Sequence, residues 1–543
     1  MDLPKEIASK VCTRSSHPNH SSSFLAFTKD PEMAAAILQF QQAPTAPMAA
    51  HSDGGGSAAN SAGVDRLSAL PNDLLVLILQ RLSTMEAART SVLSRRWPSV
   101  WTFLPELSLD LRSMPDGGIA AAITAHSVDL RRLVVLIRDA APGPGSMAAL
   151  LSAAACRLSG ILGFYNKTRA NATAQGAAAA FELPCFDRAT ILYLDLGRLC
   201  VSIAPAGVFA RLVEIYLRRV RFDDGDQCEL GAAVSSPRCP CLVKLTVYDA
   251  HGVGNLTIHS KSLLELELKW ARGLRRLAVV APALEDLKVV CCFFTHQNQP
   301  VADISACHQL LSLEWKDLFD ASTVQLGKME HLQWLATCTY QVYGDDGFLK
   351  PNRSCPELLQ CFKFRVIPGL CLTLVTLPDI GRFRYLMEHM TVIIGVRFLH
   401  MVVAANGHAF GASSFHVLRN CTGIRRLLLE LHVPTKSQAE TKCSSGCICD
   451  QPPNWKTEEL LLNHLEEIQI LELNGSEHEI SFVKWLFNWA KVLKKMTITF
   501  SNSVTESMVK EYCQLLQSSS RSEICFTFYM YRDSTEVLYS PED

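Results

Sequence analysis

The feature that most constrains the fold is a short apolar pattern that returns along the middle of the chain. Large apolar side chains occupy positions 1, 4 and 6 of a six-residue segment, except that the copy at residue 332 has Thr337 at its last position. Alternation at the last positions is typical of a β-strand with one buried face. Copies begin at residues 130, 191, 212, 242, 263, 274, 284, 310 and 332, and weaker ones begin at 359 and 424. We therefore expect many short strands in this region.

The distances between copies indicate how these strands are arranged. From residue 191 onward, successive starts are 21, 30, 21, 11, 10, 26, 22 and 27 residues apart. Most of these spacings lie near the roughly 20–29 residues of a leucine-rich repeat, in which stacked strands form a solenoid. The two shortest spacings together equal one ordinary repeat, so one of those copies is expected to be a strand between true repeats. The alternative is a generic β-rich core.

Two further features modify this solenoid. The asparagine that closes many leucine-rich repeats is mostly missing, so we expect an irregular solenoid. The Ala- and Gly-rich stretches at 141–160 and 170–180 are expected to form loops or outer helices.

Composition limits the class of protein. At 543 residues the chain is too long for one core, and 48% of its residues are hydrophobic. A formal charge of −1 gives no electrostatic reason to expect binding to nucleic acid or to a membrane. No secretory signal and no run of about 18 apolar residues is found. We therefore expect an intracellular protein, in the nucleus or cytoplasm, whose 20 cysteines are mostly reduced and buried.

The beginning of the chain differs from the repeat region. Residues 1–64 are expected to form a disordered tail, because the stretch from His51 to Gly63 is almost entirely Gly, Ser and Ala. Beyond this tail, apolar residues at positions 74, 75, 78, 79 and 82 are spaced as on one face of a helix.

Two more short helices are expected after this one. Ser83 and Glu86 form a capping-box pattern that starts the second helix. A third plausibly begins near Ser94, with Pro98 in its first turn, where proline is tolerated. So small a three-helix bundle cannot hide all of its apolar side chains, which indicates that one face meets a partner.

This helical segment closely resembles the F-box of the plant F-box/leucine-rich-repeat proteins. The resemblance rests on residues 70–75, which read LPNDLL, and residues 91–97, which read SVLSRRW, followed by Trp101. Pro98 departs from the family, which more often has a basic or polar residue at that position.

A second resemblance lies near the C-terminus. Three cysteines precede the segment DQPPNW at 450–455, and LEEI at 465–468 and LKKMTI at 493–498 follow it. This looks like the FBD segment that ends many of the same plant proteins. The resemblance is silent on the disordered tail that composition predicts at 1–64. It implies an F-box at 65–110, a leucine-rich-repeat solenoid at 125–440 and an FBD domain at 441–530. The expected fold class is α+β with an α/β solenoid: a three-helix F-box, an irregular leucine-rich-repeat horseshoe and a C-terminal FBD cap.

The resemblance also implies a function. An F-box binds a Skp-type adaptor, which docks on a cullin, while the repeats hold a target protein for ubiquitination. The chain would then be a non-catalytic, substrate-recognition subunit of an SCF-type ubiquitin ligase. By motif position, the adaptor-binding residues are expected among Leu70, Pro71, Leu74, Leu75, Ile78, Leu79, Val92, Leu93 and Trp97, some of which must form the bundle's own core. The alternative is a leucine-rich-repeat binding module that acts outside SCF with a degenerate F-box.

The sequence assigns no catalytic residue, metal ligand or cofactor. Cys443, Cys447 and Cys449, with His464 downstream, could be a zinc site, but the spacing lacks a second ligand pair, so a loop cysteine cluster is favoured. Residues 477–479, Glu-His-Glu, are interpreted as an exposed turn.

Overall fold

The computed structural model describes most of the chain beyond residue 69. By their internal contacts the described residues all belong to one unit, Arg66–Asp543. The predicted disordered tail lies outside the described residues. Described are residues 70–92, 96–110, 118–138, 143–168, 180–222, 229–293, 299–344, 350–381, 383–390, 396–421, 423–432, 447–450, 453–533 and 535–540. Within these ranges, no helix is long and apolar enough to cross a membrane.

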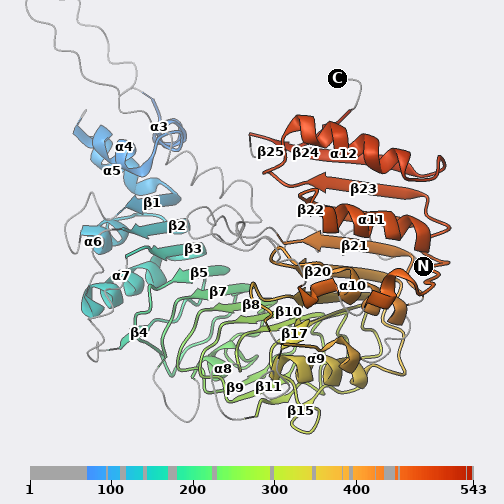
Figure 1. Cartoon of the computed structure of the whole chain (residues 1–543). Helices are drawn as coiled ribbons and strands as arrows, with labels where there is room; N and C mark the ends of the chain where they lie inside the picture. Colours follow the sequence, from blue (N-terminus) through green and yellow to red (C-terminus); the bar gives the residue numbers. More distant parts are fainter. Residues whose placement is uncertain are drawn as a thin grey trace, which may run out of the picture. The chain divides into compact units, whose positions relative to one another are not determined.

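Three short helices open the described part of the chain (Figure 1). They are α3 (Asn72–Leu79), α4 (Thr84–Arg89) and α5 (Trp97–Val100), with single 3-10 turns η1 (Thr90–Val92) and η2 (Trp101–Phe103). The predicted capping box begins α4: Ser83 Oγ accepts the Glu86 N–H at 3.3 Å, and Glu86 Oε2 accepts the Ser83 N–H at 2.9 Å. Pro98 lies in the first turn of α5, where its missing N–H leaves no helical bond unmade.

A 17-stranded mixed sheet follows these helices. Its strands pair in chain order, and every pair is parallel except the last. The strands are β1 (Glu106–Asp110), β2 (Leu130–Ile137), β3 (Leu158–Asn166), β5 (Ile191–Asp195), β7 (Glu214–Arg218), β8 (Lys244–Tyr248), β10 (Glu265–Lys269), β12 (Asp286–Val290), β14 (Ser312–Lys316), β16 (Trp334–Gln341), β18 (Gly369–Val375), β20 (Phe398–Ala404), β21 (Arg426–Leu431), β22 (Glu467–Leu473), β23 (Lys495–Phe500), β24 (Cys525–Arg532) and β25 (Thr535–Tyr539). This sheet with its flanking helices is consistent with an α/β repeat-like fold.

The repeated apolar pattern forms the core beneath this sheet. Leu245, Leu266, Leu287 and Leu313 stand opposite one another on β8, β10, β12 and β14. Each is at most 1% exposed. Because neighbouring strands repeat the pattern in register, each leucine is covered by its counterparts, which removes nearly all of its apolar surface from water.

A second, smaller parallel sheet explains the two short spacings. It consists of β9 (Asn255–His259), β11 (Arg276–Val280), β13 (Val301–Asp303) and β15 (Val324–Gln325). The copy that begins at Leu274 falls on β11 of the smaller sheet. In the sequence β11 lies between β10 and β12, which pair directly with each other in the large sheet. The prediction of a strand between true repeats is therefore confirmed. Two-stranded pairs complete the strands: β4 (Phe181–Leu183) with β6 (Val201–Ile203), and β17 (Tyr343–Gly344) with β19 (Arg384–Tyr385).

Helices lie between many of the strands in the chain (Figure 1). They are α6 (Gly118–Thr124), α7 (Pro144–Arg157), α8 (Glu229–Val234), α9 (Lys350–Cys361), α10 (Gly411–Asn420), α11 (Glu477–Trp489) and α12 (Glu506–Ser518); short 3-10 turns are η4 (Met387–His389), η5 (Ile448–Asp450) and η6 (Pro453–Lys456). The Ala-rich stretch at 141–160 gives α7, as expected for an outer helix. The stretch at 170–180 lies almost entirely outside the described residues.

Two sequence interpretations are wrong. The weak copy at residue 359 is not a strand: Leu359 belongs to α9, and Phe364 is 92% exposed. Its buried residues, Leu358, Leu359 and Phe362, follow the helical period of three to four instead. Residues 477–479 form the first turn of α11, not an exposed turn, and the Glu479 side chain is buried.

The described cysteines are thiols, and none of them is joined in a disulfide. Of the 17 described, 10 are buried, which agrees with their predicted role as small apolar residues. Burial raises the pKa of Cys421 to about 12, so this thiol stays protonated at neutral pH.

Candidate functional site

Helix α3 carries apolar side chains on two faces. Leu75 and Leu79 are 0% and 1% exposed and belong to the core. Leu74, Leu77 and Ile78 are 46%, 57% and 40% exposed. Their spacing of three and four residues places these three side chains on one face of the helix, turned to solvent. α3 therefore presents an apolar stripe, here called the α3 stripe, that its own bundle does not cover.

The structure thus divides the residues that the sequence grouped together. Among the predicted adaptor-binding residues, Leu74 and Ile78 lie in the α3 stripe, Pro71 is exposed just before it, and Leu70 is half-buried against the core. Val92 is exposed on η1. Leu75, Leu79 and Trp97 are buried, so their side chains serve the bundle's own core. Leu93 lies outside the described residues.

The sequence reading missed Leu77, which is the most exposed member of the α3 stripe. Its helical spacing from Leu74 was the available signal. The sequence also extended the helix to Leu82, but α3 ends at Leu79, and Leu82 lies in the turn beyond it. Leu75 is turned by about 100° from Leu74 around the helix axis, which carries its side chain from the exposed face into the core.

Polar contacts hold α3 against the rest of the bundle. The Arg96 guanidinium donates from Nε and Nη2 to the Asn72 side-chain oxygen at 2.9 and 2.6 Å. This contact joins the start of α3 to the start of α5. The bundle is in turn fixed to the sheet, since Thr84 Oγ1 accepts the N–H of Ser108 on β1 at 2.8 Å. The α3 stripe is therefore displayed on a supported helix.

The sheet face opposite the leucine core is polar and charged. On β14, Glu314 pairs with Lys316 at 2.8 Å, and on β10 Glu267 pairs with Lys269. Burial by itself would raise the pKa of Glu314, but the Lys316 and Lys288 ammonium groups outweigh burial and lower its pKa to about 2. The Glu314 carboxylate is therefore ionised at neutral pH.

Arginines and aromatic residues gather where the neighbouring strands end. Asp249, just after β8, pairs with Arg198 at 3.2 Å and with Arg272 at 3.8 Å; these two arginine side chains are 52% and 42% exposed. Trp270, 44% exposed, stacks on Tyr248 with ring centroids 6.3 Å apart. We call these residues the arginine–aromatic edge.

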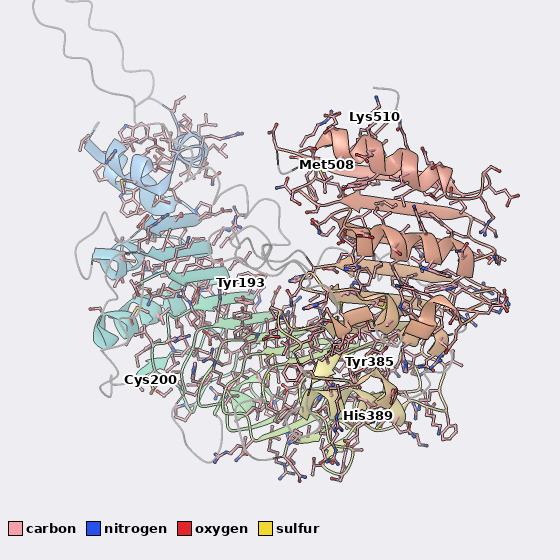
Figure 2. The ribbon with its side chains drawn as sticks, viewed as in Figure 1. Tyr193, Cys200, Tyr385, His389, Met508 and Lys510 are labelled. Atoms are coloured by element: carbon pink, nitrogen blue, oxygen red, sulfur yellow. The ribbon has the colours of Figure 1, made fainter. Side chains whose placement is uncertain are left out.

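The same edge continues along the sheet toward β5. Asp195 receives two hydrogen bonds from Arg219, from Nε at 2.7 Å and from Nη2 at 2.8 Å. Tyr193 of β5 (Figure 2) and Tyr216 of β7 face each other with ring centroids 6.0 Å apart. Exposed arginine and aromatic side chains are the residue types that most often anchor protein interfaces.

Backbone conformation shapes this edge. The residue directly after each of β7, β8, β10 and β12 has a positive φ: Arg219 (47°), Asp249 (51°), Trp270 (57°) and Cys291 (52°). A left-handed residue at the same place in each repeat turns the chain in the same way each time. None of the four is glycine or asparagine, so each turn carries some strain that the repeated packing must offset.

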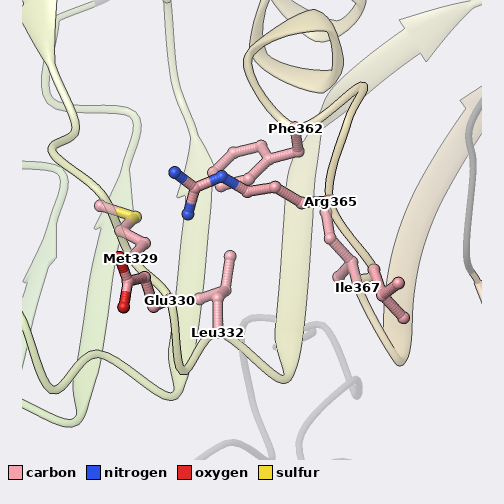
Figure 3. Close-up of a pocket in the computed structure, with 7 residues that line it drawn as sticks. Met329, Glu330, Leu332, Phe362, Arg365 and Ile367 are labelled. Atoms are coloured by element: carbon pink, nitrogen blue, oxygen red, sulfur yellow. The ribbon is translucent and has the colours of Figure 1, made fainter.

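One pocket among the described residues is small and mixed in character. It has a volume of about 310 Å³ and is lined by Met329, Glu330, Leu332, Phe362, Arg365, Val366 and Ile367. Figure 3 shows the Arg365 side chain reaching across the pocket toward the loop that carries Met329 and Glu330. Glu330 and Arg365 are the ionisable residues in this lining, which contains no histidine, cysteine or hydroxyl group.

Potential metal ligands meet at one place in the described part of the chain. His408, Cys447 and Cys449 bring one ligand atom each to within 4.8 Å of one another. His464, the histidine that follows these cysteines in the sequence, is exposed and lies outside this group. Cys443 lies outside the described residues.

Comparison with known proteins identifies two domains. The family model "F-box domain" matches residues 67–108, and the family model "FBD" matches residues 458–498. The first match contains the α3 stripe. The second runs from the residues before β22 through α11 and most of β23.

Relatives in Arabidopsis thaliana align with most of the chain. One F-box/FBD/LRR-repeat protein is 25% identical over 501 residues, which is 85% of this chain and 95% of the relative. Another of the same description is 23% identical over 479 residues, with the same coverage of both chains. An F-box/LRR-repeat protein is 29% identical over 249 residues, covering 42% of this chain and 65% of the relative. The chain thus contains an F-box domain and an FBD domain and is homologous over most of its length to the plant F-box/FBD/LRR-repeat proteins.

Proposed function

We propose that this protein is the substrate-recognition subunit of an SCF-type ubiquitin ligase. The observation that carries this proposal is the α3 stripe: Leu74, Leu77 and Ile78 are exposed apolar residues within the segment that matches the F-box model. F-box domains generally bind Skp-type adaptors. The α3 stripe supplies an apolar surface for such an adaptor, which in turn docks on a cullin.

The energetics of this contact follow from its residues. Burial of a large apolar side chain stabilises an interface by about 1.5–3 kcal/mol, and a few central residues usually dominate the affinity. Leu74, Leu77 and Ile78 project from one helix, which matches the packing of an amphipathic helix against an apolar partner surface. Pro71 and Val92 are further exposed apolar residues within the segment that matches the F-box model.

We further propose how the rest of the chain serves this role. The division is an F-box at 65–110, a leucine-rich-repeat horseshoe at 125–440 and an FBD cap at 441–530. The repeats hold the target protein, and the arginine–aromatic edge is the surface we assign to it, since its arginines favour an acidic segment of the target. Ubiquitin transfer itself falls to the conjugating enzyme, and we assign this chain no catalytic step.

The alternative is a repeat-based binding module outside SCF with a degenerate F-box. Its one motif-level support is Pro98. Pro98 lies in the first turn of α5, where proline does not disturb a helix, and Trp97 and Val100 on either side of it are buried. This departure from the family pattern therefore does not argue against adaptor binding.

Co-purification with a plant Skp-type adaptor tests the proposal. The full chain is compared with a Leu74→Ala/Ile78→Ala double variant and with a Leu461→Ala control, because Leu461 is equally exposed, at 47%, but lies outside the F-box match. Retention of the adaptor by the wild type and the control, and its loss from the double variant, is the expected result. A folded wild-type chain that retains no adaptor would favour the free-standing module.

A further inference from the structure

Three metal-binding side chains converge from two distant parts of the sequence. His408 lies in the connection between β20 and α10, and Cys447 and Cys449 lie in or next to η5. Cys447 Sγ is 3.4 Å from His408 Nδ1, and all three ligand atoms lie within 4.8 Å of one another. The stretch between the histidine and the first cysteine is 39 residues long.

The hydrogen bond made by Nε2 of His408 determines that Nδ1 is the nitrogen available to bind a metal ion. His408 Nε2 lies 3.0 Å from the carbonyl oxygen of Pro378. A carbonyl oxygen only accepts hydrogen bonds, so Nε2 must carry the proton. The neutral ring therefore has its lone pair on Nδ1, which points at the cysteine sulfur. Metal-bound histidines usually have this arrangement, in which the other ring nitrogen donates to a carbonyl or carboxylate group.

The backbone around both halves of the site is held by further bonds. Tyr343, which is 1% exposed, donates from its hydroxyl to the Cys449 carbonyl at 2.9 Å. Asn406, two residues before His408, donates to the Thr376 carbonyl at 2.8 Å. His408 and Cys449 are only 8% and 4% exposed. The ligands therefore stand on supported backbone in a mostly buried place, as a structural metal site requires.

We propose that His408, Cys447 and Cys449 bind a zinc ion. In tetrahedral coordination, a sulfur at about 2.3 Å and a nitrogen at about 2.05 Å from zinc lie about 3.6 Å apart. The observed separation of 3.4 Å between Cys447 Sγ and His408 Nδ1 is close to this value. Two thiolates and an imidazole are soft ligands that favour zinc over magnesium or calcium.

The binding step balances as the loss of two thiol protons. Zn²⁺ replaces the S–H protons of Cys447 and Cys449, and both protons pass to water. His408 binds through Nδ1, which carries no proton. The bound ion would tie the segment at 447–450 to the β20–α10 connection. That segment leads directly to Trp455, which is 4% exposed and packs edge-on against Trp485 and Trp489 of α11. The ion would therefore clamp the start of the C-terminal region onto the repeats.

Metal content and Co²⁺ spectroscopy on the full chain test this site. The protein is loaded with Zn²⁺, freed of excess metal and analysed for zinc. Separately, the metal-free protein is titrated with Co²⁺, whose absorption reports thiolate ligands and tetrahedral geometry. We expect one zinc per chain, a thiolate-to-cobalt absorption band, and binding of Co²⁺ weakened at least about 10-fold by Cys447→Ser, Cys449→Ser or His408→Asn.

Two control variants separate this site from adventitious thiol binding. Cys361→Ser removes an exposed cysteine of α9, and His464→Asn removes the exposed histidine outside the group. Both should keep the full Co²⁺ spectrum. A folded wild-type chain without any thiolate-to-cobalt band would overturn the proposal, and this result does not depend on whether a variant folds. A band that survives both Cys447→Ser and Cys449→Ser would place the metal elsewhere and overturn it equally.

Discussion

Leucine side chains are buried in the 17-stranded sheet but partly exposed on helix α3. On the sheet, Leu266 and Leu287 are 1% and 0% exposed, because the strands on either side carry leucines at the same register. On α3, Leu74 and Leu77 are 46% and 57% exposed. In a stack of repeats, each strand buries the leucines of its neighbours, whereas a small helical bundle can bury only the side chains that face its single core. Under the proposed function, we therefore expect apolar residues to govern stability in the first region and partner binding in the second.

The largest expected effect is on the stability of the sheet. Leu266→Ala should lower the free energy of unfolding by about 2–5 kcal/mol, since it leaves a cavity among packed strands. Leu77→Ala should change it by no more than about 0.5 kcal/mol, as for an exposed residue. Urea unfolding of the two variants and the wild type measures both values. Equal destabilisation by the two substitutions would remove the distinction between the regions.

The next effect concerns a buried carboxylate within the repeats. Asp317 is 0% exposed and accepts backbone N–H groups from Phe293 at 3.1 Å and Leu318 at 2.8 Å, as well as from Cys292. Asp317→Ala should cost about 2–4 kcal/mol, because each buried N–H left without a partner costs about 1–3 kcal/mol. The matched change Asp320→Ala, at a more exposed aspartate that binds Ser322, should cost less than half as much in the same unfolding assay.

Asp317 also predicts a pH dependence. Burial raises its pKa to about 6, while its bonds to backbone N–H groups oppose the increase. The native state then binds this proton more tightly than the unfolded chain does, so the contribution of Asp317 to stability is present below about pH 4 and lost as the pH rises through about 6. Thermal unfolding between these pH values should show a smaller loss of stability in Asp317→Asn. An unchanged pH profile in that variant would contradict the shifted pKa.

The smallest effect compares two copies of one local motif. Ser83 and Glu86 cap α4, and Ser476 and Glu479 cap α11 with the same reciprocal bonds. Hydrogen bonds from Ser83 lower the pKa of Glu86, whereas burial raises the pKa of Glu479. Ser476→Ala should cost about 1 kcal/mol in thermal unfolding. Ser83→Ala, in the exposed box, should cost less, and the reverse order would show that burial does not strengthen this cap.

Sequence reasoning succeeded where one local period controls the structure. Strands at the clear copies of the repeat follow from alternation, and the start of α4 follows from Ser83 and Glu86. It failed where two periods compete, as at Leu359, whose neighbours at 358 and 362 fit a helix as well as 359, 362 and 364 fit a strand. The interpretation of residues 477–479 as an exposed turn failed for a related reason. Asn474 and Gly475 do indicate a turn, but a helix begins directly after it.

The residues of the candidate sites could not be fully predicted, because tertiary contacts between distant parts of the sequence decide which side chains are exposed and which meet. The sequence groups Leu74, Leu75, Ile78 and Leu79 on one helix, but only the packed bundle separates the exposed Leu74 and Ile78 from the buried Leu75 and Leu79. The cluster of His408, Cys447 and Cys449 shows the larger limit. The sequence offers only His464 near the cysteines and favours a loop cysteine cluster over a zinc site, whereas His408 reaches the cysteines through the fold from 39 residues upstream.

The measurement that tests the central claim most directly is the affinity of the full chain for a Skp-type adaptor. Isothermal titration would compare the wild type with Leu77→Asp and with Leu461→Asp, which adds the same charge at an exposed leucine outside the F-box match. A central interface residue contributes about 2 kcal/mol or more, so Leu77→Asp should weaken binding at least about 30-fold while Leu461→Asp leaves it unchanged. Equal affinity of Leu77→Asp and the wild type would contradict the assignment of the α3 stripe as the adaptor-binding surface.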